Sequence, residues 1–105
     1  MDAKVIHELH GERTVAVVLA PGEEAGRTLA DFARRERLAS ARFTGIGALS
    51  RATLGFFDPD RKTYRAIHVD QQVEVVSLVG NVALAGPCPA VTRNLFPFPH
   101  HRAAP

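Results

Sequence analysis

Four polar residues in the middle of the chain have the side-chain types of a hydrolytic triad: Ser50, His68, Asp58 and Asp70. A serine nucleophile of this kind typically lies on a sharp strand-to-helix turn within a Gly-x-Ser-x-Gly pattern. No such pattern surrounds Ser50. Because these residue types are common and their co-occurrence says little about geometry, we expect no catalytic residue and a protein that is not an enzyme.

A glycine-rich stretch before Ser50 superficially matches a phosphate-binding loop, with Gly45, Gly47 and the serine hydroxyl. A dinucleotide-binding loop needs a third glycine and then a helix whose N-terminus holds the phosphates. That glycine is missing, and the residues that follow have the composition of a strand. We therefore expect these residues, together with Gly55, to allow the close approach of a ligand or a neighbouring subunit.

The histidines and the cysteine do not form a recognisable metal site. His7 and His10 are three residues apart, which on a strand directs them to opposite faces. The pair His100-His101 has no further ligands beside it, and Cys88 stands between prolines without a basic partner. We expect no metal, no cofactor and no catalytic role for the cysteine.

The composition is that of one small globular domain. Of the 105 residues, 46% are hydrophobic and 23% are charged. A domain of this size buries a modest share of its surface, so oligomerisation would stabilise it. The formal net charge of +2 is too small to indicate a nucleic-acid partner by itself.

The single cysteine excludes an internal disulfide, which favours a reducing compartment. No apolar run approaches the roughly 20 residues of a membrane span. Charged residues and His7 occupy the positions where a signal peptide has its apolar core. We therefore expect a cytoplasmic protein without a membrane partner.

The periodicity of the apolar residues predicts an α+β domain with one main helix, at about residues 23–38, and a mainly antiparallel sheet. The run from Arg13 to Ala20 is apolar on both faces and predicts a central buried strand. The run from Val73 to Leu84 predicts another.

From about residue 86 the chain becomes rich in proline, which breaks helices and ladders. We expect a domain at 1–85 and an irregular tail at 86–105. The further strands are expected at 4–10, 41–49, 51–58 and 64–68.

Basic residues gather at the end of the predicted helix, where Arg34, Arg35 and Arg37 complement the negative end of its dipole. Dipole complementarity and solubility explain these side chains without a partner. Contact with nucleic-acid phosphates is the alternative, and Arg42 then joins the same group.

One stretch resembles the signature of a known family: Phe-Thr-Gly-Ile-Gly-Ala-Leu-Ser-Arg-Ala-Thr-Leu-Gly-Phe-Phe-Asp, from Phe43 to Asp58. It is similar to the PPC domain, the plant and prokaryote conserved domain. The flanking segments Gly11–Thr14 and Val73–Gly80 agree with it, and the resemblance covers residues 3–84. It implies an α/β domain with an antiparallel sheet and one main helix, assembled as a homotrimer.

The resemblance also implies a function, since plant relatives are nuclear DNA-binding regulators and prokaryotic ones are usually called DNA-binding proteins. Plant members engage partners through a Gly-Arg-Phe-Glu-Ile-Leu segment. Here Gln71–Val76 stands in its place and Glu74 matches, which implies a ligand or subunit contact at Glu74. After Leu84 the family pattern is lost, and we expect an incomplete C-terminal part.

We therefore expect a non-enzymatic DNA-binding or transcription-regulatory homotrimer, with phosphate contacts from Arg34, Arg35, Arg37 and Arg42. One alternative is a trimer that binds a small molecule or a metal between its subunits. Another is a degenerate, truncated copy without a function of its own.

Overall fold

The computed structural model describes the backbone of residues 1–99 and the side chains of residues 1–92 other than Phe56. It contains one helix and mainly antiparallel strands, which confirms the predicted α+β class. The elements in chain order are β1 (Asp2–Leu9), β2 (Glu12–Val18), α1 (Ala25–Arg35), β3 (Ser40–Leu49), β4 (Ala52–Asp58), β5 (Thr63–Val69), β6 (Val73–Ala85) and β7 (Cys88–Pro99).

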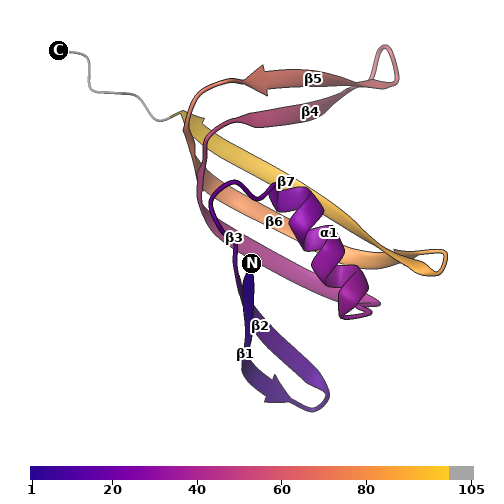
Figure 1. Cartoon of the computed structure of the whole chain (residues 1–105). Helices are drawn as coiled ribbons and strands as arrows, with labels where there is room; N and C mark the ends of the chain where they lie inside the picture. The colour runs from indigo at the N-terminus through magenta and orange to yellow at the C-terminus, as the bar shows by residue number, and fades with distance from the viewer. Residues whose placement is uncertain (100–105) are drawn as a thin grey trace. The chain divides into compact units, whose positions relative to one another are not determined.

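The described chain divides into two compact units. The first comprises residues 1–40 and 82–91, and the second comprises residues 41–81 together with the described residues from 92 onward. The strands form a two-stranded sheet β1-β2, a two-stranded sheet β4-β5 and a three-stranded sheet with the order β3-β6-β7 (Figure 1).

The first unit begins with the antiparallel hairpin β1–β2. Its turn contains His10 and Gly11 with φ angles of 53° and 79°. Two consecutive left-handed residues are typical of the type I′ turn, whose twist matches that of the strands. The prediction of a central buried strand at residues 13–20 is wrong, because β2 pairs only with β1 among the described strands and Val18 is 64% exposed. Apolar, β-branched composition favours a strand but does not determine what covers it.

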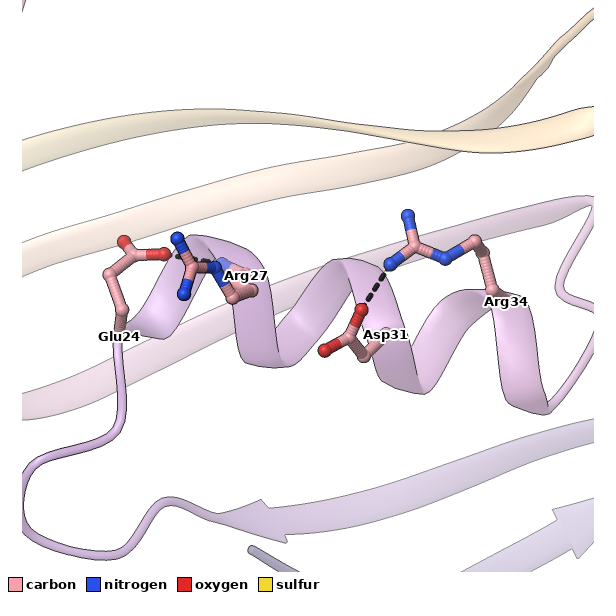
Figure 2. A network of polar contacts seen from close by, with 4 residues as sticks. All are labelled: Glu24, Arg27, Asp31 and Arg34. Atoms are coloured by element: carbon pink, nitrogen blue, oxygen red, sulfur yellow. Dashed lines mark hydrogen bonds and ion pairs between the residues drawn. The ribbon is translucent and has the colours of Figure 1, made fainter.

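Helix α1 begins where the sequence provides an acidic N-cap. The Glu24 carboxylate accepts hydrogen bonds from the backbone N–H groups of Gly26 (3.0 Å) and Arg27 (2.5 Å), as Figure 2 shows for Arg27. These bonds satisfy two of the amides that a helix start leaves without partners. Phe32 and Ala33 are buried.

The second unit holds the signature stretch in β3 and β4. Strand β6 lies between β3 and β7, as its apolar residues on both faces predicted. Val73, at its start, is completely buried. The core is small: the buried apolar residues among those described are Phe32, Ala33, Val73 and Val82.

The predicted irregular tail is wrong for residues 88–99, which form strand β7. Proline removes a ladder donor, so it is tolerated chiefly on edge strands. Strand β7 is the outer strand of its sheet, which explains how Pro97 and Pro99 fit within it. Gly86, with a φ of 65°, and Pro87 connect it to β6. The division into a domain at 1–85 and a tail at 86–105 stays a prediction, and residues 100–105 lie outside the described part.

Within the described part of the chain, no helix is long and apolar enough to cross a membrane.

Candidate functional site

The predicted phosphate-contacting arginines of the first unit lie at the C-terminal end of α1, but two of them have intramolecular partners. Arg34 forms an ion pair with Asp31, one turn earlier on the exposed face of the helix (Figure 2). The guanidinium of Arg35 lies 5.8 Å from the centre of the Phe32 ring, in cation–π geometry. Both side chains therefore have structural roles at the helix surface.

Arg37 differs from these two. It follows the C-cap residue Glu36 in the left-handed conformation, with a φ of 54°. The amide of Arg37 donates to the carbonyl of Arg34 (3.1 Å), and the amide of Leu38 donates to that of Ala33 (3.0 Å). This is the Schellman ending of a helix, in which the left-handed position is usually glycine.

Arginine at this position costs about 1 kcal/mol or more in conformational energy relative to glycine. The Arg37 side chain is exposed, and it forms no ion pair with any described residue. Its guanidinium can therefore contact an anion without breaking an existing bond.

Acidic side chains next to this cluster are neutralised locally. Glu36 pairs with Arg13 across 3.4 Å, with both side chains partly exposed. The sequence did not indicate Arg13, because the pair joins β2 to the helix end across 23 residues of chain. Since Asp31 is paired as well, the end of α1 presents an excess of positive charge.

Near the N-terminal end of α1, Glu23 also has partners. The backbone N–H of Ala20 donates to the Glu23 carboxylate at 2.7 Å, and the Met1 amino group lies 2.9 Å from it. These contacts, the amide first, hold the pKa of Glu23 below its ordinary value. Glu23 is thus neutralised locally, as Glu36 and Asp31 are near the other end of the helix.

Arg42 is exposed on β3. It belongs to the second unit, whereas the α1 arginines belong to the first. Its predicted role in phosphate contact stays a prediction.

The glycines predicted to contact a ligand or a subunit have different surroundings. A Cβ atom at Gly45 would lie 3.0 Å from Cδ2 of Leu78, so this glycine allows β3 and β6 to pack closely. Gly47 has a φ of 145° and open space beside it. Ser50 is exposed just after β3. Their contact with a ligand or subunit stays a prediction.

Two further members of that set lie on other strands. Gly55 is on β4, where a Cβ atom would meet the Tyr64 ring at 3.8 Å. Glu74 is exposed on β6. The sequence missed Gly80, a more restricted strand glycine than Gly45 or Gly55, whose missing Cβ leaves room for the Phe43 ring and the Thr92 carbonyl oxygen.

Two of the four triad-type residues, His68 and Asp58, have structural partners. His68 Nδ1 lies 3.2 Å from the hydroxyl of Thr53, its cross-strand neighbour. The Asp58 carboxylate accepts from the backbone amides of Asp60 (3.0 Å) and Arg61 (3.4 Å) and so shapes the β4–β5 turn. These contacts explain both residues as parts of a hairpin.

His7 and His10 line the same shallow, half-open depression of about 220 Å³ on the β1–β2 hairpin, with Leu9, Glu12 and Thr14. The expectation of opposite faces fails because His10 lies in the left-handed turn rather than on the strand. Even so, no group of three or more His, Cys, Asp and Glu side chains in the described residues is arranged to hold a metal. Cys88 is exposed, and the pair His100-His101 lies outside the described residues.

Comparison with known proteins identifies relatives of this arrangement. The family model described as the Plants and Prokaryotes Conserved (PCC) domain, also written PPC, matches residues 6–96. No match was found among curated proteins.

Solved structures show the same fold. A plant- and prokaryote-conserved protein from Pyrococcus horikoshii is 28% identical, with a TM-score of 0.69, and the match covers 77% of this chain and 63% of that one. A putative DNA-binding protein from Ralstonia eutropha JMP134 is 32% identical, with a TM-score of 0.61, and the match covers 68% of this chain and 49% of that one.

A metal-containing protein from Archaeoglobus fulgidus is 24% identical, with a TM-score of 0.74, and the match covers 80% of this chain and 60% of that one. At that identity the likeness establishes the fold alone. The chain therefore matches between about half and two thirds of the length of these structures.

Proposed function

The chain belongs to the Plants and Prokaryotes Conserved (PCC) domain family, and we propose that it acts without catalysis as a DNA-binding, regulatory module. Relatives from Ralstonia eutropha and Bacteroides thetaiotaomicron, 32% and 28% identical, are described as putative DNA-binding proteins. The phosphate contacts are assigned to Arg34, Arg35 and Arg37 in the first unit, and to Arg42 in the second.

Arg37 carries this proposal. An arginine occupies the left-handed position where glycine is the more stable choice, and its guanidinium has no ion-pair partner among the described residues. Local strain of this kind is retained most readily where a side chain has a function. A duplex phosphate beside the helix end would also be attracted by the unpaired positive charge of the Arg37 guanidinium.

The test is a gel-shift titration of duplex DNA at low salt. We expect simultaneous charge reversal of Arg34, Arg35, Arg37 and Arg42 to abolish the shift. Among single variants, we expect Arg37→Gly to weaken binding and at the same time to raise the melting temperature, because glycine relieves the left-handed strain.

Arg27→Gly is the matched control, since it removes one exposed arginine from the first turn of the same helix. This change should destabilise the helix by about 1 kcal/mol and leave binding unchanged. Absence of any shift at low salt overturns the proposal, as does equal weakening by the two glycine variants.

We further propose that the module is a homotrimer. Support comes from the apolar surface of β3, where Ile46 is 96% exposed between Gly45 and Gly47. A subunit packed there would bury this side chain, and the open space beside Gly47 would allow its backbone to approach. Light scattering should give three times the 11.4 kDa mass of the chain, and the Ile46→Asp protein should have the mass of a single chain. A wild-type mass of one chain contradicts the assembly.

A small molecule held between subunits is the second candidate, favoured by the open space beside Gly47. A ligand that binds the folded trimer would raise its melting temperature. A screen without any such shift, on well-folded trimer, would count against this site.

A further inference from the structure

One face of the β4–β5 hairpin exposes an unusual set of side chains. Cross-strand pairing sets Thr53 opposite His68, Gly55 opposite Ala66 and Phe57 opposite Tyr64. Because alternate residues of a strand share a face and paired residues point the same way, these six residues form one surface. All six are exposed. We call this surface the Tyr64 face: Thr53, Gly55, Phe57, Tyr64, Ala66 and His68.

The Tyr64 face has an aromatic end and a flat middle. The rings of Phe57 and Tyr64 are 5.4 Å apart at an interplanar angle of 61°, and they remain 50% and 76% exposed. Next to them, Gly55 and Ala66 have almost no side chain to cover the backbone. A planar group could therefore lie with its face against the tyrosine ring and its edge over the glycine and alanine.

The other end of the face offers hydrogen bonds. His68 Nδ1 is 3.2 Å from the Thr53 hydroxyl, which fixes the ring beside the flat middle. No hydrogen bond to its Nε2 atom is found within the described residues, so this atom can donate to or accept from a ligand. The surface thus combines ring contacts with polar groups, as a heterocyclic base requires.

Cations lie at both ends of the face, and acidic residues near it equal them in number. None of its six residues is acidic. Arg51 immediately precedes β4, while Arg61 and Lys62 lie in the turn at the far end. Acidic residues are also nearby, but the Asp58 carboxylate is engaged by turn amides. The remaining ones are Asp60, in the turn, and Asp70, after β5.

We propose that the Tyr64 face binds single-stranded nucleic acid by stacking an unpaired base on Tyr64 over the floor of Gly55 and Ala66. Exposed aromatic side chains on a strand, with cations beside them, are how single strands are held without sequence readout. Paired bases in a duplex do not offer a free ring face. The inference rests on the proposed function for the class of partner, but it uses residues other than the α1 arginines.

Tyr64 allows a direct test, because it is the only tyrosine of the chain and there is no tryptophan. Intrinsic fluorescence therefore reports on this ring alone. Titration with an oligothymidylate should quench it, whereas an abasic oligonucleotide of equal length and charge should not. N-acetyl-tyrosinamide in the same titration corrects for absorbed light. Equal quenching by both oligonucleotides, or none by either, overturns the proposal.

Variants separate stacking from general charge in an anisotropy assay with labelled oligothymidylate. Tyr64→Ala should weaken binding about 5- to 150-fold, the range expected for loss of one stacked base. Tyr64→Phe should retain it. Ala66→Gln, which keeps the tyrosine and the net charge but obstructs the floor, should abolish it. Ile67→Thr is the control, since Ile67 is exposed on the opposite face of the same hairpin.

Duplex binding by the same proteins distinguishes this proposal from the proposed function. Loss of single-strand binding in Tyr64→Ala with an unchanged duplex shift supports the Tyr64 face, even if the α1 arginines fail their own test. Unchanged single-strand binding in both Tyr64→Ala and Ala66→Gln overturns it. So does tyrosine fluorescence that depends on protein concentration without nucleic acid, because a second copy of the chain then covers the face.

Discussion

Replacing Gly80 by alanine should destabilise the protein more than the same change at the strand glycines Gly45 or Gly55. The new methyl group would lie 2.8 Å from Cε1 of Phe43, and closer still to the tip of that ring and to the carbonyl oxygen of Thr92. The ring can rotate. The carbonyl belongs to the backbone of β7 and can withdraw only if the strand moves.

Overpacking of this kind costs about 1–3 kcal/mol, and the backbone clash sets the expectation at the upper end, about 2–3 kcal/mol. For a domain of this size that lowers the melting temperature by roughly 8–20 °C. Thermal unfolding followed by circular dichroism measures it.

Two other strand glycines serve as controls. At Gly45 the nearest atom is the flexible tip of Leu78, 3.0 Å away, so alanine there should cost less. At Gly55 the nearest atom is 3.8 Å away in the Tyr64 ring, so alanine should be neutral or slightly stabilising. A Gly80→Ala protein as stable as Gly55→Ala would refute the packing of β6 between β3 and β7.

Three further predictions concern stability. Val73→Ala should lower the free energy of unfolding in urea by about 1.5–3 kcal/mol, because Val73 is completely buried. At Val76, which is 63% exposed, the same change should alter it by less than about 0.5 kcal/mol. Similar losses in the two variants would contradict the burial of Val73. Glu24→Ala removes the helix N-cap and should cost about 1 kcal/mol, and an unchanged urea midpoint would contradict the capping geometry. The lowered pKa of Glu23 means that its contribution is present above the unfolded-state pKa and is lost as the pH falls through the folded-state value. Glu23→Gln should therefore flatten the acid limb of a stability–pH profile, and an identical profile would contradict the Ala20 contact.

Local signals in the sequence predicted the helix well. The acidic residue Glu24 and the arginines after Phe32 mark its two ends, and each acts through atoms within a turn of itself. The observed helix, Ala25–Arg35, lies within the predicted range. The central place of β6 was also predicted, because apolar residues on both faces require neighbours on both sides.

The errors concern features that depend on distant parts of the chain. Proline content predicted an irregular tail, yet β7 forms because it occupies a sheet edge, which composition does not reveal. Similarly, β2 has the composition of a buried strand but is partnered only by β1 among the described strands.

The candidate sites show the same division. The arginines were visible as a cluster, but the left-handed angle of Arg37 could not be expected of a residue that is not glycine. The Tyr64 face depends on the register that pairs Phe57 with Tyr64 and Gly55 with Ala66. A two-residue alternation in the sequence indicates each strand's faces, but only the pairing brings the two sets together.

The most direct test of the central claim is the salt dependence of duplex binding by the wild-type protein and by Arg37→Gln. Each phosphate contact releases counterions, so the logarithm of the binding constant should fall linearly with the logarithm of the salt concentration. We predict that this negative slope becomes shallower by about one unit in the variant, the amount expected for one lost phosphate contact. Identical slopes for the two proteins, or no binding at low salt, would contradict the assignment of DNA binding to this end of α1.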